Sequence, residues 1–241
     1  MTPILKLLIE EAASPLQAVE TKFAVDGTGF STSTYVRWID HNYGKGRGQR
    51  QYVKLHLVVG VQTQVVTAVR VTEGSAHDSP YLPALVKETA ARFCLLEVSA
   101  DKGYLSRRNL AVIAGTGAVP YIPFKSNTTG EGPDLWRKLW HYYEFNREEF
   151  LKHYHQRSNV ESAFSMIKRK FGGDVRSKKP IAQLNEALCK VLCHNLCVLV
   201  QSIYELGIEP KFWAPSRLLG QTRLLGQIRR LPQKSAKRRT Y

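Results

Sequence analysis

The stretch YHQRSNVESAFSMIK, residues 154–168, has the pattern of a single helix with two different sides. Val160, Phe164 and Ile167 recur at steps of four and three residues, which is the spacing of the apolar stripe of an amphipathic helix. We therefore expect the helix to bury this stripe and to leave its other side free for chemistry.

The polar side of the same helix carries Tyr154, Arg157, Glu161 and Lys168. Side chains three or four residues apart are neighbours on a helix, so one carboxylate is flanked by two cations. This arrangement suits a site in which the carboxylate holds a metal ion and the cations hold phosphates. The alternative is an ordinary solvated helix with an Arg–Glu ion pair.

The spacing of these four polar residues resembles the Tyr-Arg-Glu-Lys signature of DDE-class insertion-sequence transposases, in the insertion sequence four/five-like group, where it closes the catalytic domain. That family also needs two upstream aspartates at the ends of buried strands. The sequence supplies Asp26 in KFAVDGTGF and Asp101 in LLEVSADKGY. The resemblance covers residues 22–200, and the segment between Asp101 and Glu161 is short, as in compact members.

The resemblance implies a catalytic and metal-binding triad made of Asp26, Asp101 and Glu161. These carboxylates would hold two Mg²⁺ ions, with Mn²⁺ able to substitute. Hard cations take oxygen ligands, and two ions about 4 Å apart can activate a nucleophile and stabilise the leaving oxygen. Taken singly, an aspartate before glycine at a strand end is usually a turn former.

The resemblance also implies DNA contacts, to phosphates and terminal bases, from Tyr154, Arg157 and Lys168. His77-Asp78 resembles a short motif found in such proteins, but we favour a helix N-cap for Asp78, because a helix starts just after it. Two further residues resemble family positions without needing a function on a strand, Lys54 and His56.

The pattern of the whole chain predicts an α/β fold, a ribonuclease-H-like mixed sheet flanked by helices. We expect Gly27 and Gly29 to end the first strand, and the apolar run after Cys94 to form a buried strand that delivers Asp101. Strands are expected at 22–28, 51–61, 64–71, 94–100 and 118–122, and helices at 79–92, 106–114, 134–153 and 181–204. The predicted units are a short N-terminal helix at 1–21, a catalytic domain at 22–205 and a basic tail at 206–241.

The 241-residue chain carries a formal net charge of +15, which favours a polyanionic partner. We expect double-stranded DNA (transposon ends and target), bound by a homodimer. The basic, glycine-rich segment 31–50 can track a phosphate backbone or be a solvated hairpin loop. We find no secretory signal and no apolar run long enough for a membrane span, so we expect a cytoplasmic, nucleoid-associated protein of a bacterium or archaeon without a membrane partner.

The cysteines at 94, 189, 193 and 197 are expected to be small buried thiols, because three thiols at steps of four climb a helix rather than converge on one zinc ion.

The function predicted from the sequence is a DNA transposase that performs metal-dependent hydrolytic cleavage at transposon ends and strand transfer into target DNA. Alternatives are a metal-dependent nuclease of the same fold, a non-catalytic DNA-binding protein, and a basic structural or RNA-associated protein. The residues before Asp26 are too few for the DNA-binding region that usually precedes this domain, which adds the alternative of a truncated, inactive remnant.

Overall fold

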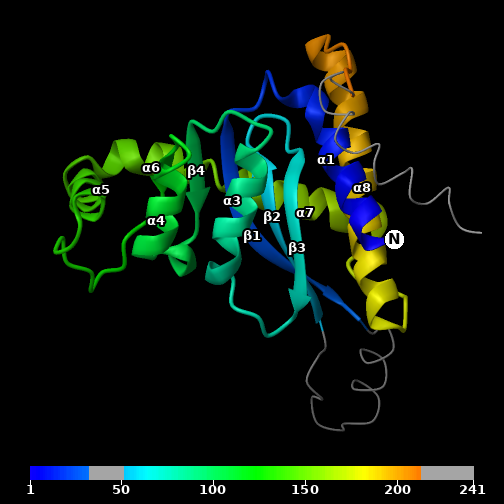
Figure 1. Cartoon of the computed structure of the whole chain (residues 1–241), viewed down its shortest axis with the longest axis horizontal. Coiled ribbons are helices and arrows are strands. Elements are labelled where there is room, and N and C mark those ends of the chain that lie inside the picture. Colours follow the sequence, from blue (N-terminus) through cyan, green and yellow to red (C-terminus); the bar gives the residue numbers. More distant parts are fainter. Residues whose placement is uncertain (33–51, 213–241) are drawn as a thin grey trace, which may run out of the picture.

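A five-stranded mixed sheet forms the centre of the molecule (Figure 1). The computed structural model describes residues 1–32 and 52–212. Along the sheet the order is β3-β2-β1-β4-β5, with β1, β2 and β3 antiparallel and with β4 and β5 parallel to β1. This is the ribonuclease-H-like arrangement, which confirms the predicted fold class. The strands are β1 (Lys22–Ser31), β2 (Tyr52–Gly60), β3 (Val66–Glu73), β4 (Glu97–Ala100) and β5 (Val119–Tyr121).

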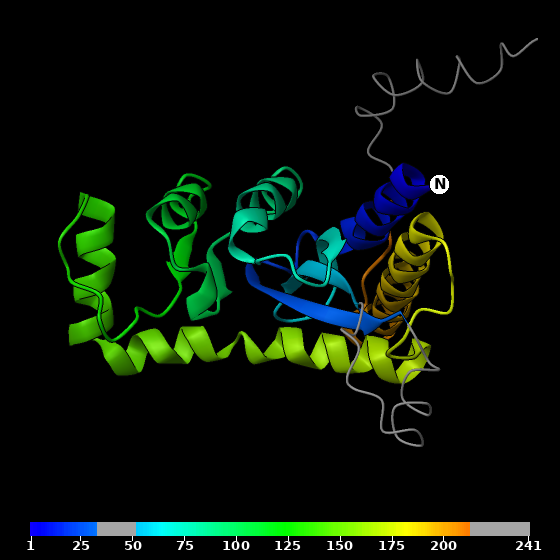
Figure 2. The same cartoon turned by 90° about the horizontal axis from the view of Figure 1, so that it is seen from below.

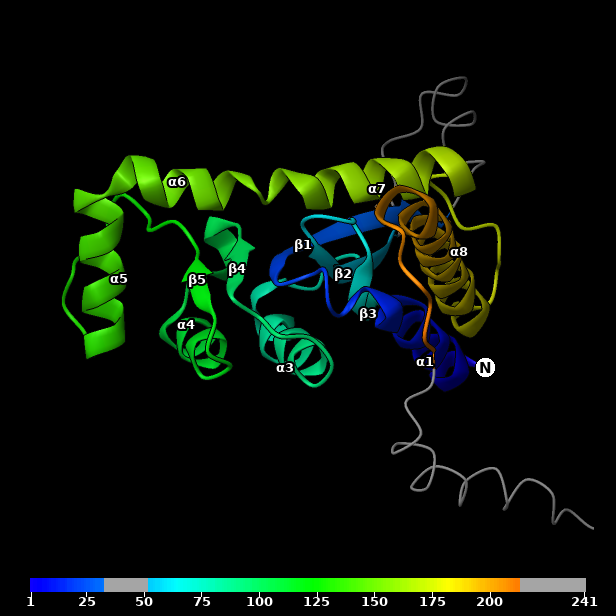
Figure 3. The same cartoon turned by 90° about the horizontal axis from the view of Figure 1, so that it is seen from above.

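Helices cover both faces of the sheet. One face is covered by α3 and α4, and the other by α7, which continues the line of α6 along the length of the molecule (Figures 2 and 3). The helical elements are α1 (Thr2–Ala13), η1 (Ser14–Leu16), η2 (Ser79–Tyr81), α3 (Leu82–Ala90), η3 (Lys102–Tyr104), α4 (Arg107–Ala114), α5 (Asp134–Phe145), α6 (Arg147–His155), α7 (Ser158–Phe171) and α8 (Pro180–Leu206).

The side chains of β1 alternate between two hydrophobic cores. Phe23 and Val25 belong to the core beneath α3 and α4, whereas Ala24 and Phe30 belong to the core beneath α7. This alternation follows from the two-residue period of a strand. It places Asp26 on the face of the sheet that α7 covers.

The long helix α8 joins these layers to the N-terminus. Asn195 is fully buried, accepts a hydrogen bond from Val66 N at 2.9 Å, and donates one to the carbonyl oxygen of Ile9 at 3.1 Å. Its amide therefore links α8 to β3 and α1. Because a buried amide without partners is costly, these bonds fix the register of the three elements.

Helix α8 corrects one expectation from the sequence. We expected no long apolar run, yet α8 is long and apolar enough, by length and composition, to cross a membrane. Half of that apolar window is buried within the fold, and Val191, Val198 and Leu199 belong to the two cores. Packing against the sheet accounts for this side of the helix.

The cysteines are also placed differently from the prediction. All four are exposed: Cys94, and the three on the outer side of α8, which are Cys189, Cys193 and Cys197. Cys94 precedes β4, which begins only at Glu97. The thiols of α8 lie on the side of that helix opposite its buried residues, so the apolar sequence hid a helix with only one buried side.

Two predictions fall outside the described residues. The glycine-rich, basic segment predicted for DNA contacts lies almost entirely within residues 33–51, and most of the predicted basic tail lies within residues 213–241.

Candidate active site

Asp26 and Asp101 come from neighbouring parallel strands. Asp101 directly follows the last residue of β4, and the register pairs Val25 with Ala100, so the two aspartates are adjacent across the sheet. Asp26 does not lie at a strand end as predicted, because β1 continues through both glycines to Ser31. Its pairing with β2 is unbroken, and the fully buried Phe30 anchors its second half.

Arg157 connects Asp26 to Glu161. Its Nη1 donates to Asp26 Oδ2 at 2.6 Å, and its Nη2 donates to Glu161 Oε1 at 2.7 Å. The guanidinium also lies over the Tyr154 ring, 6.0 Å from its centroid. The helix edge proposed from the sequence therefore meets the strand that carries the first aspartate.

We expected the signature to form one helix, but in the structure it is divided between two helices. Tyr154 lies in α6, which ends at His155, and the chain then turns at Gln156 and Arg157. Glu161 and Lys168 belong to α7. At this turn the guanidinium of Arg157 points toward β1 and pairs with Asp26. In a continuous helix it would lie along the surface of the helix. The apolar stripe is buried as predicted, at Val160, Phe164 and Ile167.

Lys168 lies further along α7, away from the carboxylates. Its Nζ is 5.6 Å from the centroid of the Phe30 ring, at the far half of β1. Burial lowers the pKa of this amine. It can contact a ligand that extends along α7 beyond Glu161.

The three acids do not converge as a set. Within the described ranges, no three His, Cys, Asp or Glu side chains are arranged to hold a metal ion. The Glu161 side chain is 58% exposed and is held by Arg157, which places a positive charge between Asp26 and Glu161.

The electrostatics around Asp26 nonetheless suit a cation. Burial raises the pKa of the Asp26 carboxyl, the Gly27 N–H and Arg157 oppose that rise, and Asp101 and Asp78 add to it. Like charges raise each other's pKa until a cation neutralises them. The donor set also consists of carboxylate oxygens, which magnesium-type ions prefer.

A buried hydroxyl gives a second sign that this region is incomplete. Tyr104 is 2% exposed, and its hydroxyl has no hydrogen-bond partner among the described residues. Burial raises the pKa of this phenol, and so do the charges of Asp78, Asp26 and Asp101. A buried hydroxyl without a protein partner is a place where a water molecule can bind.

Asp78 corrects a further expectation. We favoured a helix N-cap, but its side chain makes no capping hydrogen bond to η2. Its Oδ1 instead lies 2.8 Å from Lys54 Nζ and 2.9 Å from His56 Nδ1. Three residues for which we predicted no firm role from the sequence thus meet beside Asp26. The available signal was a Lys and a His at alternate positions of an otherwise apolar strand.

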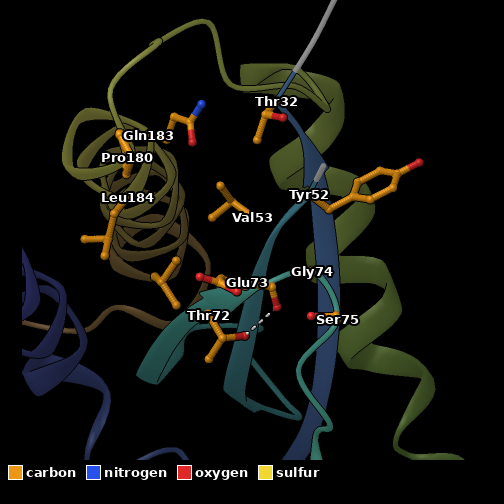
Figure 4. Close-up of a pocket in the computed structure, with 11 residues that line it drawn as sticks. Thr32, Tyr52, Val53, Thr72, Glu73, Gly74, Ser75, Pro180, Gln183 and Leu184 are labelled. Carbon is orange, nitrogen blue, oxygen red and sulfur yellow. Dashed lines mark hydrogen bonds between the residues drawn. The ribbon is translucent and has the colours of Figure 1, made fainter. Parts of the chain in front are cut away.

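A cavity of about 890 Å³ lies elsewhere, between the strands' far ends and the start of α8 (Figure 4). Its lining includes Thr32, Tyr52, Glu73 and Gln183, and none of the predicted site residues.

The strand order and directions, with helices on both faces of the sheet, define a ribonuclease-H-like domain. Comparison with known sequences is specific: the family model described as the transposase DDE domain matches residues 17–196. The chain belongs to this family. DDE transposase domains generally depend on a divalent metal ion.

The chain is similar to a probable transposase for insertion sequence element ISA1214 of Archaeoglobus fulgidus, with 27% identity over 180 residues. The match covers 75% of this chain and 54% of the relative, so the chain spans about half the length of that protein. Among solved structures, it is similar to a piggyBac transposase in a synaptic complex with hairpin DNA, with a TM-score of 0.46 and 9% identity. That match covers 90% of this chain and 59% of the other.

Proposed function

We propose that this chain is the catalytic domain of a DNA transposase of the insertion sequence four/five-like group, which cuts transposon ends and joins them to target DNA. The observation that carries the proposal is the contact of Arg157 with both Asp26 and Glu161, which joins the signature to the first aspartate. Asp101 directly follows the adjacent parallel strand, β4. Spacing in the sequence and contact in space thus select the same residues.

Asp26, Asp101 and Glu161 are the residues that would hold two Mg²⁺ ions, or Mn²⁺ in their place. Such ions supply Lewis acidity to the scissile phosphate and lower the pKa of bound water. The exposed Glu161 side chain can swing toward the aspartates once Arg157 releases it. Arg157 is then free to pair with a phosphate, which its planar guanidinium fits in two-point geometry.

The remaining signature residues would hold the DNA. Tyr154 offers a ring beside Arg157, and Lys168 can contact the backbone further along α7. We infer a double-stranded DNA partner, consistent with the net charge of +15, and a homodimer that brings two ends together. Binding to chromosomal DNA would place the protein at the nucleoid of a bacterial or archaeal cell.

The experiment is nicking of supercoiled plasmid DNA by the full chain with Mg²⁺ or Mn²⁺. We expect Asp101→Asn and Glu161→Gln each to reduce the rate by at least about 10³-fold, as expected when groups that act as a unit are lost. Glu148→Gln, an exposed carboxylate on α6, is the matched control and should nick like the wild type. Unchanged DNA binding without metal-dependent nicking by the wild type would indicate a DNA-binding remnant instead.

A further inference from the structure

Lys54, His56 and Asp78 form a cluster around the fully buried His56, on the face of the sheet opposite Arg157. Lys54 and His56 come from β2, and Asp78 from the turn before η2. Lys54 Nζ also donates to the carbonyl oxygen of Ala76 at 3.0 Å. The cluster draws on two segments and none of its members belongs to the predicted triad or DNA-contact set.

His56 is fixed on every side. Its side chain is 0% exposed, its Nε2 lies 2.9 Å from Thr72 Oγ1, and its ring stacks on Tyr81 with centroids 4.6 Å apart. A histidine held in this way cannot rotate without unpacking the sheet. It therefore fixes the position of the Asp78 carboxylate that it contacts.

Asp78 reaches the site through a gap left by Gly27. A Cβ atom at Gly27 would lie 2.7 Å from Asp78 Oδ1 and 3.2 Å from Lys54 Cε, closer than such atoms pack. Gly27 directly follows Asp26 and pairs with His56 across the two strands. The Asp78 carboxylate thus lies against the backbone of Gly27, the residue directly after Asp26.

The two oxygens of Asp78 have different surroundings. Oδ1 is buried against Lys54 and His56, yet the side chain as a whole is 33% exposed. The exposed part therefore includes Oδ2. One oxygen is anchored, and the other has a fixed position from which it can accept a hydrogen bond.

The unpartnered hydroxyl of Tyr104 points to what Asp78 would bind. Tyr104 lies one turn after Asp101, to whose carbonyl oxygen its N–H donates at 2.9 Å, and its buried hydroxyl has no hydrogen-bond partner among the described residues. Water bound to a cation at Asp26 and Asp101 could satisfy both this hydroxyl and the free oxygen of Asp78. Removing a carboxylate that hydrogen-bonds to a metal ligand commonly weakens metal binding about 10- to 100-fold.

We propose that Asp78, anchored by Lys54 and His56, is a fourth carboxylate of the site, a positioning residue that binds water on the divalent cation and so strengthens its binding. This inference rests on the proposed metal site. Lys54 balances the charge of Asp78, so the fourth acid orients water with little added repulsion between carboxylates.

The test is Mn²⁺ binding by the full chain, followed by the electron paramagnetic resonance signal of free Mn²⁺. We expect Asp78→Asn to weaken Mn²⁺ binding about tenfold. Glu73→Gln, an exposed carboxylate at the end of β3, should bind like the wild type. Thermal unfolding of each variant shows whether the fold is kept, and Asp78→Glu should recover part of the affinity because it restores the charged acceptor.

Asp26→Asn separates the two proposals. If Asp26→Asn abolishes Mn²⁺ binding and a folded Asp78→Asn protein binds as tightly as the wild type, the role of Asp78 is overturned and the metal site stands. If the wild type shows no saturable Mn²⁺ binding, or Asp26→Asn binds unchanged, the metal site itself is wrong and the role of Asp78 falls with it.

Discussion

Asp26 has two unlike neighbourhoods, one on each face of the sheet. On the α7 side, Arg157 holds it together with a glutamate that is mostly exposed. On the other side, the strand backbone rests on Asp78, which a fully buried histidine and a lysine hold in place. The first side includes the mostly exposed Glu161, and the second is anchored by the fully buried His56.

The two sides of Asp26 differ in how easily their side chains can rearrange. Releasing Glu161 from Arg157 breaks an ion pair whose carboxylate side chain is 58% exposed, and such pairs contribute about 0–1 kcal/mol. Releasing Asp78 would unpair Lys54, whose side chain is as little exposed as that of Arg157 (21% each), and would also leave Nδ1 of the fully buried His56 without its carboxylate. We therefore regard the α7 side as the part that rearranges when metal and DNA bind, and the Asp78 side as a fixed support.

The largest effect should come from closing the gap at Gly27. Gly27→Ala places a methyl group 2.7 Å from Asp78 Oδ1, and the anchored carboxylate cannot retreat without losing Lys54 and His56. We expect the free energy of unfolding to fall by about 2 kcal/mol, as for overpacked interiors, measured by urea denaturation.

Gly29→Ala is the matched control in the same strand. A Cβ there would lie 3.5 Å from Tyr52 Cδ1, which is ordinary contact, so the free energy of unfolding should change by less than about 0.5 kcal/mol. Equal losses at the two glycines would mean that strand geometry, and not the Asp78 contact, sets the requirement for glycine.

The sequence predicted most of this frame because the frame depends on periodicity. Alternation in β1 and the stripe Val160, Phe164 and Ile167 state which side of each element is buried, and burial then fixes sheet and helix. The position of Asp101 at the end of β4 was predicted correctly, because an acid that follows a short apolar run marks the point where a buried strand ends.

The support side was hidden because it arises between elements. The contact of Asp78 with Lys54 and His56 joins residues from two separate segments of the chain. It also requires glycine at position 27, because a Cβ atom there would collide with Asp78. The division of the signature between α6 and α7 was not predicted for a similar reason. The ion pair of Arg157 with Asp26 is a tertiary contact, and no local sequence pattern predicts it.

A smaller effect, of opposite sign to that of Asp78→Asn, is expected on the α7 side. Arg157→Gln removes the positive charge that occupies the space between Asp26 and Glu161, so Mn²⁺ alone should bind about tenfold tighter, which corresponds to about 1.4 kcal/mol. Plasmid nicking should nevertheless fall, because the proposed phosphate contact is lost. Both are measured on one preparation by spin resonance and gel assay.

Arg137→Gln is the matched control, because its guanidinium pairs with Asp134 on α5, away from the site. It should leave Mn²⁺ affinity and nicking unchanged. Weaker Mn²⁺ binding by Arg157→Gln would contradict the idea that Arg157 stands in for the metal, and it would make both sides of Asp26 fixed supports.

The smallest effect concerns acid pH, which should act on the packed interior and not on the exposed α7 edge. His194 is 1% exposed, its Nε2 lies 2.9 Å from the carbonyl oxygen of Gln64, and burial lowers the pKa of its imidazole. Burial likewise lowers the pKa of His56. Below about pH 6.5 the unfolded chain therefore binds protons that the folded chain refuses, so these groups make stability fall as pH falls toward their folded pKa values.

His194→Gln keeps a donor for Gln64 but removes one of these protons. We expect its loss of unfolding free energy between pH 7.5 and 5.5, from urea denaturation, to be smaller than that of the wild type by up to about 1 kcal/mol. The comparison of the two proteins is needed because burial raises the pKa of Glu20, which makes stability rise as pH falls and partly masks the histidines. An equal loss in both proteins would show that His194 does not contribute to acid sensitivity, and the buried side would then owe that sensitivity to His56 beside Asp78.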